Sequence, residues 1–131
     1  MKLATLIEPL DLDYINPDFT DEHFPYEDKG QGDVMLFHTK DKYLSAEEVL
    51  KRMNIKGLRP ATLHEMLAWA KDNWKDEFVV VALGSVWTDR DGDRHVACLD
   101  QDGSLRDLDL SWCDDDWNEF CRFAAVKVPR K

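Results

Sequence analysis

The sequence predicts an α+β domain in which two short helices precede a run of strands. Two capped segments with apolar residues at helical spacing lie between residues 45 and 74. After them, short apolar or alternating runs separated by turn residues predict four or more short strands, mostly antiparallel. A length of 131 residues suits one domain. We expect an acidic leader over residues 1–33 that wraps a body formed by residues 34–131.

The leader is rich in turn-forming and acidic residues. It holds nine acidic residues against two lysines, a net charge of −7 out of −10 for the whole chain. Since prolines and glycines interrupt it, we expect an ordered loop held to the body by apolar side chains that would otherwise face water. The expected anchors are Leu10, Leu12, Tyr14, Ile15, Phe19, Phe24 and Tyr26.

Two capping signals mark the starts of the helices. Ser45 with Glu48 three residues later is a capping box, and this helix should end where helix-terminating residues cluster at 54–57. Thr62 and Glu65 repeat the signal for a second helix. One apolar stripe follows that second cap, formed by Leu63, Met66, Leu67, Ala70 and Trp74.

The strands are predicted from short runs bounded by turns. The valine-rich run at residues 78–83 has the length and composition of a central strand buried on both faces. The polar strings at residues 89–93 and 100–103 are expected to be turns, the first closing a hairpin. The strands are expected at residues 33–38, 78–83, 95–99 and 105–112.

Composition disfavours several functional classes. No apolar run is long enough to cross a membrane, and the start of the chain turns acidic before a signal-peptide core could form. Strong acidity disfavours direct binding to nucleic acid or anionic membranes and favours a basic partner. Three cysteines without metal spacing suit reduced thiols in the cytoplasm, while a bridge between Cys113 and Cys121 stays open.

Motifs for metal binding or catalysis are missing. Asp89–Asp93 places its glycine fourth, which suits a hairpin turn and not a calcium loop. Asp114–Asp116 needs a nearby cation, which a metal, Arg122, an amine of a ligand or solvent counterions would supply. The four histidines show no paired spacing, and we expect them at the surface or in strands. We therefore predict no metal, no cofactor and no enzyme, with Cys113 or Cys121 as the only candidate nucleophile.

Residues 104–128 give the strongest functional signal. Strand alternation separates leucines on one face from aspartates on the other, and an acidic, aromatic loop follows at residues 113–119. We expect Trp112 in the core and Trp117 open to solvent, because tryptophans among small polar residues suit binding surfaces. The candidate ligand-binding residues are Asp107, Asp109, Ser111, Cys113, Asp115, Trp117, Asn118 and Glu119.

Three fragments carry a resemblance to known proteins. LRPAT at residues 58–62, with Glu65 and two alanines after it, is similar to the start of the main helix in C-type-lectin-like domains of the formylglycine-generating-enzyme type. CRFAAV at residues 121–126 resembles the closing strand of that fold. With ALGSVW at residues 82–87, both fragments are still more similar to a group of uncharacterised proteins from candidate-phyla bacteria.

This resemblance implies a C-type-lectin-like domain of the kind used by variable proteins of diversity-generating retroelements. In those proteins, solvent-facing codons near the C-terminus are rewritten while the scaffold stays fixed. The resemblance implies a scaffold of Leu105, Leu108, Leu110, Trp112, Trp117, Arg122 and Phe123. It implies an adjustable set of Asp107, Asp109, Ser111, Cys113, Asp115, Asn118 and Glu119. It carries over no catalysis, since the cysteine or metal site of the enzyme type has no counterpart here.

We therefore expect a noncatalytic binding module whose acidic, aromatic C-terminal face contacts a protein or peptide with a basic surface. The alternative is a small acidic inhibitor or nucleic-acid mimic, in which the leader at residues 1–33 would occupy the groove of a basic enzyme.

Overall fold

The computed structural model describes residues 2–30, 32–75 and 77–129. Short helices and strands alternate along the whole chain. In order they are α1 (Leu3–Ile7), a 3-10 turn (Glu8–Leu10), β1 (Tyr14–Ile15), β2 (Val34–Phe37), β3 (Tyr43–Leu44), α2 (Ala46–Ile55), β4 (Leu58–Pro60), α3 (Leu63–Asn73), β5 (Val79–Thr88), β6 (Arg94–Asp102), β7 (Leu105–Trp112), β8 (Trp117–Asn118) and β9 (Cys121–Lys127).

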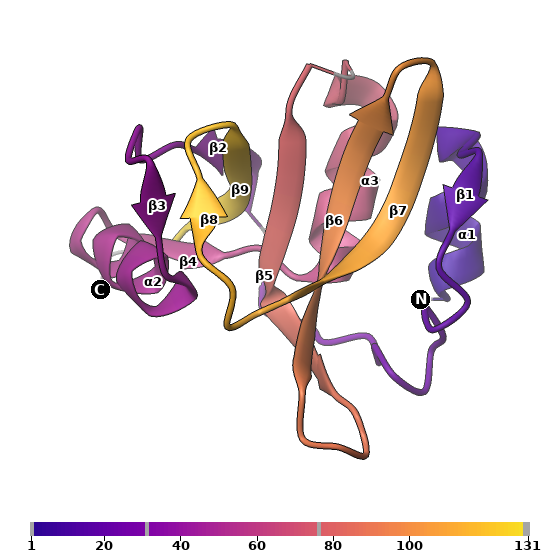
Figure 1. The fold of residues 1–131 in the computed structure, drawn as a ribbon, viewed down its shortest axis with the longest axis horizontal. Coiled ribbons are helices and arrows are strands. Elements are labelled where there is room, and N and C mark those ends of the chain that lie inside the picture. Colours follow the sequence, from indigo (N-terminus) through magenta and orange to yellow (C-terminus); the bar gives the residue numbers. More distant parts are fainter. Residues whose placement is uncertain (1, 31, 76, 130–131) are drawn as a thin grey trace.

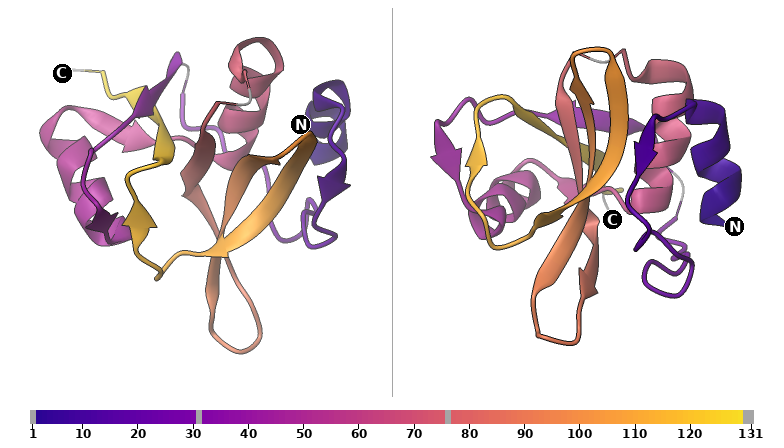
Figure 2. Two further views of the ribbon diagram at one scale, coloured as in Figure 1. Left: turned by 45° about the horizontal axis from the view of Figure 1, so that its top comes forward. Right: turned by 45° about the vertical axis from the view of Figure 1, so that its right-hand side comes forward.

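One mixed sheet organises the molecule, and this confirms the predicted α+β class (Figure 1). Its seven strands follow the order β1-β7-β6-β5-β9-β2, and β4 pairs with β9 off this path. A second sheet joins β3 to β8. Figure 2 shows α1 beside α3 on one side of the large sheet, with α2 on the other. The sheet is therefore the middle layer of the fold.

Each side of the sheet has its own core. Residues of β5 alternate between the two, since Val80 and Ala82 pack with α1 and α3 whereas Val81 and Leu83 pack with α2. All four are buried, which confirms a central strand covered on both faces at residues 80–83. Phe78, the first residue of the predicted run, is 38% exposed and lies just before β5.

Both predicted helices are confirmed, with the full capping box at Thr62 but only the serine half of it at Ser45. The Ser45 hydroxyl accepts from the backbone N–H of Glu48 at 3.2 Å at the start of α2. At the start of α3, Thr62 Oγ1 accepts from the N–H of Glu65 at 3.2 Å, and Glu65 Oε1 accepts from the N–H of Thr62 at 2.9 Å. The apolar stripe of α3 is buried along its whole length: Leu63, Met66, Leu67, Ala70 and Trp74.

The leader is a structural part of the domain as well as a wrapping loop. It begins with the unpredicted helix α1, whose Leu3 and Ile7 are buried against the α3 side of the sheet. Its strand β1 pairs in parallel with β7, with Tyr14 opposite Asp107. The expected anchors divide into buried Leu10, Phe19 and Phe24, half-buried Leu12, and exposed Tyr14, Ile15 and Tyr26. Removing the leader would therefore remove core residues, so deletion cannot isolate its charge.

The strand predictions hold with one correction, the position of the second turn. Asp89 Oδ1 accepts from the N–H groups of Asp91 at 2.9 Å and Asp93 at 3.0 Å, which confirms the first turn. The second turn was placed too early, because β6 continues to Asp102 and the chain reverses at Gly103 with φ of +61°. Most strand pairs are antiparallel, as predicted, and the parallel pairs are β5 with β9 and β1 with β7.

An ion pair fastens the cap of α3 to β4. Arg59 donates from both terminal nitrogens to the two oxygens of Glu65, each at 2.8 Å. Burial alone would raise the pKa of Glu65, but the hydrogen bonds from Arg59 and Thr62 outweigh burial, and the pKa lies below its ordinary value of 4.5. The folded state therefore favours the carboxylate form of Glu65.

We expect the Glu65→Gln variant to lose about 1–3 kcal/mol of unfolding free energy at neutral pH. Glutamine retains an acceptor for the capping box but not the charge that Arg59 contacts. A depressed folded pKa stabilises the protein above the unfolded value, and this contribution is lost as pH falls through the lowered folded pKa. Urea denaturation at pH 7 and at successive steps below pH 4.5 should show the two proteins converging. A difference that stays constant with pH would contradict the assignment.

Candidate functional site

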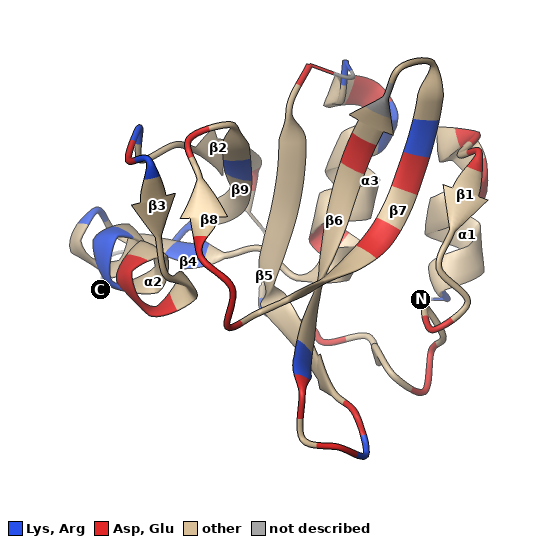
Figure 3. Cartoon of the chain, in the orientation of Figure 1, with Lys and Arg blue, Asp and Glu red and all other residues tan. Residues whose placement is uncertain are grey.

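The strand part of the predicted site lies on the α2 side of β7. Asp109 is exposed and accepts from Asn16 Nδ2 at 2.9 Å, while Asp107 is half-buried. Ser111 is also half-buried and accepts from the Cys98 thiol at 3.1 Å. Residues of α2 pack in one core with residues of β5 and β9, and in Figure 1 neither α2 nor the small sheet crosses β7. Figure 3 shows acidic residues along β6 and β7.

Asp100 extends this surface onto β6. It lies directly opposite Asp107 in the antiparallel pair, and Asp109 lies opposite Cys98. Residues directly opposite each other share one face of a sheet, so these three carboxylates lie on the same face. Asp109 is exposed there, whereas Asp100 and Asp107 are half-buried and Asp107 Oδ1 is buried. We call Asp100, Asp107 and Asp109 the acidic face.

The loop part of the predicted site is divided between surface and core. Asp115, Asn118 and Glu119 are exposed, whereas Cys113 and Trp117 are 6% exposed and belong to the α2-side core. Asn118 Oδ1 accepts from the N–H of Phe120 at 2.9 Å and so shapes the turn into β9. The predicted set therefore forms no single surface, and Cys113 and Trp117 are not available to a ligand.

The expected environments of the two tryptophans are reversed. Trp117 lies in β8 opposite Leu44 of β3, and its ring meets the Phe123 ring edge to face at 6.0 Å between centroids. Trp112 is 58% exposed. It pairs with His95 at the end of β7, near the β5–β6 hairpin, which projects beyond the helices (Figure 1). The alternation of β7 is regular, but the core does not extend to its last residue.

An aromatic hollow adjoins the acidic face, and the sequence did not predict it. Phe78 is 38% exposed and Phe120 is 69% exposed, and the Arg122 guanidinium lies 4.0 Å from the centroid of the Phe78 ring. The hollow has a volume of about 230 Å³, and Asp100 belongs both to its wall and to the acidic face. Its lining is Glu77, Phe78, Val79, Asp100, Gln101, Phe120 and Arg122. Parallel pairing of β5 with β9 brings these residues together, and no local motif signals it.

The three cysteines are buried, and the acidic loop contains an ion pair. Cys98, Cys113 and Cys121 are free and buried. Burial raises the pKa of Cys98 to about 12 and also raises the pKa of Cys113 and Cys121, which disfavours the thiolate that a nucleophile requires. Asp114 forms an ion pair with Arg94, a partner that the sequence did not indicate. Within the described ranges, no three His, Cys, Asp or Glu side chains are placed to hold a metal.

His64 departs from the expected surface or strand location. It lies in α3 with 3% of its surface exposed, and neither ring nitrogen has a hydrogen-bond partner among the described residues. Burial lowers its pKa and favours the neutral ring. The ring packs against the edge of Tyr26, at 5.3 Å between centroids. Its position on the apolar side of α3 was not apparent from the histidine spacing.

Comparison with known proteins finds no family model, no curated protein and no solved structure that matches the chain. None of the helices in the described ranges has the length and apolar character required to span a membrane.

Proposed function

We propose that the chain is a noncatalytic binding module that holds a basic protein or peptide against the acidic face and the aromatic hollow. The observation that carries this proposal is the continuity of the two surfaces through Asp100, which belongs to both. Exposed aromatic surface beside clustered carboxylates supplies the two chemistries of a binding site for a cationic segment.

Each part has a distinct role in the proposed complex. The carboxylates would attract lysine and arginine side chains and speed association, an effect that salt weakens. Phe120 and Phe78 would supply buried contact area, as aromatic anchors do at interfaces. Arg122 covers the Phe78 ring and limits its apolar surface, so Phe120, which is 69% exposed, is the main anchor.

The proposal includes a C-type-lectin-like scaffold with an adjustable C-terminal segment. Of the adjustable set, Asp109, Asp115, Asn118 and Glu119 are exposed, whereas Cys113 is buried. If this segment is diversified, substitutions should spare Trp117 and Phe123 and concentrate on the exposed positions. The test is genomic: a neighbouring reverse transcriptase and a near-copy of the coding segment that differs at adenines.

Neutralising the acidic face should abolish most binding without unfolding the domain. We expect Asp100→Asn with Asp109→Asn, and separately Phe120→Ala, each to weaken binding of a short blocked peptide of alternating lysine and phenylalanine by about tenfold or more. Unfolding free energies should change by about 0.5 kcal/mol or less, because Asp109 and Phe120 are exposed and Asp100 retains its shape as asparagine.

Isothermal titration at low and high salt measures the effect, and circular dichroism monitors the fold. Asp91→Asn, in the β5–β6 turn, is the matched control and should bind as the original protein does. Equal peptide affinity for all variants, or loss of the fold in the double variant, would show that the acidic face is not the binding surface.

A further inference from the structure

The strand β2 forms the edge of the large sheet farthest from β1. Its inner edge pairs with β9, from Val34 opposite Val126 to Phe37 opposite Phe123. No strand of the described chain pairs with its outer edge. The strand contains neither proline nor lysine, residues that protect exposed edges from added strands, and its Met35 is 48% exposed. This edge is therefore open to strand addition.

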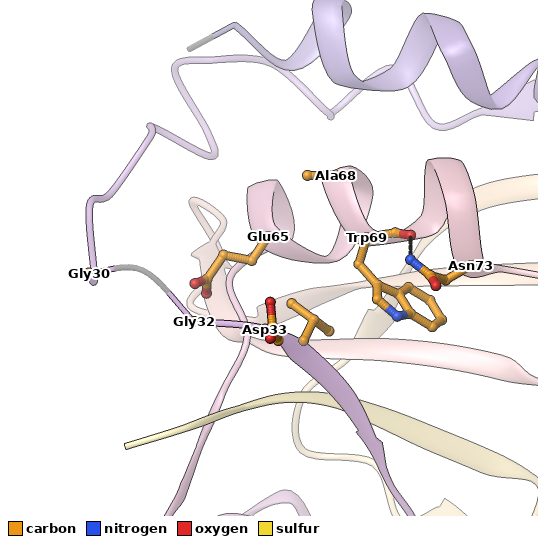
Figure 4. Close-up of a pocket in the computed structure, with 8 residues that line it drawn as sticks. Gly30, Gly32, Asp33, Glu65, Ala68, Trp69 and Asn73 are labelled. Carbon is orange, nitrogen blue, oxygen red and sulfur yellow. Dashed lines mark hydrogen bonds between the residues drawn. The ribbon is translucent and has the colours of Figure 1, made fainter. Parts of the chain in front are cut away.

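A hollow of about 620 Å³ lies beside this edge on the α3 side of the sheet. Figure 4 shows Glu65 and Trp69 extending from α3 on the side where β2 begins and Asp33 lies. The Glu65 carboxylate is held by Arg59, whereas Asp33 is exposed. The lining thus combines a solvent-accessible carboxylate with the half-buried ring of Trp69, a combination that accommodates a lysine or arginine side chain.

A second hollow, of about 210 Å³, lies at the other end of β2, on the α2 side. Phe37 forms part of its wall and belongs to the α2-side core, and Ile55 at its rim is 74% exposed. Arg52 and the exposed Lys56 also line it, and the Arg52 guanidinium is engaged by Asp41 and Glu48. Together with Met35, this side presents mainly apolar surface beside the edge. The two sides of the edge therefore differ in chemistry.

We propose that the outer edge of β2 accepts an extended, basic segment of a partner polypeptide as an additional strand. Side chains of an added strand point alternately to the two sides of the sheet. Its basic residues would enter the hollow at Asp33 and Trp69, and its apolar residues would pack near Met35 and Ile55. A second copy of this chain fits less well, because both copies would carry a net charge of −10.

A blocked peptide of alternating valine and lysine tests the proposal in an Asp100→Asn/Asp109→Asn background, which weakens the acidic face. We expect binding by fluorescence anisotropy and slower amide hydrogen exchange confined to β2. Asp33→Asn should weaken binding about fivefold or more, while Asp91→Asn, the matched exposed control, leaves it unchanged. Phe120→Ala should also leave it unchanged, which separates this edge from the surface of the proposed function.

Two further peptides separate strand addition from simple charge attraction. One peptide is N-methylated at its odd positions and the other at its even positions, so each loses every second backbone N–H donor. The peptide whose methyl groups face the edge of β2 should not bind. A valine–glutamate peptide should not bind. The proposal is overturned if both methylated peptides bind like the parent, if protection appears away from β2, or if no binding is seen at millimolar peptide. Sedimentation that shows dimers formed through β2 would assign the edge to a second copy and overturn the foreign partner.

Discussion

Replacing Trp117 by alanine is expected to lower the free energy of unfolding by about 3–5 kcal/mol, a large share of the stability of an ordinary domain. The side chain is 6% exposed and fills the space between β8 and the α2-side core. Its ring contacts Phe123 of β9 and so ties the small sheet to the large one. Truncation would leave a cavity that these elements cannot close without separating from β3.

Trp112→Ala is the matched control, because it removes the same side chain from a site that is 58% exposed. We expect it to cost about 0.5 kcal/mol or less. Trp117→Phe should cost much less than alanine, since phenylalanine retains most of the volume and removes a buried indole N–H that has no hydrogen-bond partner among the described residues. Urea denaturation monitored by circular dichroism measures all three. Equal losses for the two alanine variants would contradict the observed exchange of environments.

Local signals predicted the elements that depend on nearby residues. The caps at Ser45 and Thr62 and the apolar stripe that ends at Trp74 depend on residues a few positions apart in the sequence. They can therefore be predicted from the sequence alone. The valine run at residues 80–83 was predicted for the same reason, because burial on both faces leaves no alternation. These elements form the centre of the fold.

Long-range pairing decided the positions that were predicted wrongly. Trp117 is buried because β8 meets β3, a partner far away in the sequence and only two residues long. The aromatic hollow likewise depends on parallel pairing, which brings Phe78 beside the turn that carries Phe120. Alternation assigned the faces of β7 correctly, yet it contains no information on where the covering layer ends, so the exposure of Trp112 was missed.

The unequal coverage of the sheet explains where both proposed surfaces lie. The helices and the small sheet bury residues 80–83 of β5 and 123–126 of β9, whereas Asp109 of β7 is exposed and no described strand pairs with the outer edge of β2. Substitutions at the buried positions of β5 and β9 should therefore act through stability, and exposed substitutions at β7 or β2 through binding. The two kinds of effect should separate in any mutational series on this chain.

Gly84→Ala should be the most destabilising of the glycine-to-alanine substitutions, and we expect it to lower the free energy of unfolding by about 3 kcal/mol or more. A Cβ at this position would lie 2.6 Å from the Ala61 carbonyl carbon and 2.7 Å from the Pro60 oxygen. Both contacts are to backbone, so no rotamer change relieves them. The Gly84 N–H donates to the Ala61 oxygen at 2.9 Å, which keeps the two segments close.

The surroundings of Gly84 cannot readily move away. Ala61 also donates its N–H to the Ala124 oxygen at 2.9 Å, and Leu63 donates its N–H to Ser85 Oγ at 2.8 Å. These bonds hold the start of α3 against β5 and β9, so displacing it would disturb three elements together. The glycine and serine of ALGSVW at residues 82–87 thus have a structural role: they fasten the central strand to the main helix.

Gly92→Ala separates this steric cost from the ordinary cost of replacing a glycine. Gly92 has φ of +86°, but no atom lies within 4 Å of the position that an added Cβ would occupy, so alanine there should cost about 1–2 kcal/mol from backbone strain alone. Thermal and urea denaturation should place Gly84→Ala well below Gly92→Ala in stability. Equal losses of stability in the two variants would contradict the close backbone contact between β5 and the start of α3, because β5 could then accommodate a methyl group at Gly84.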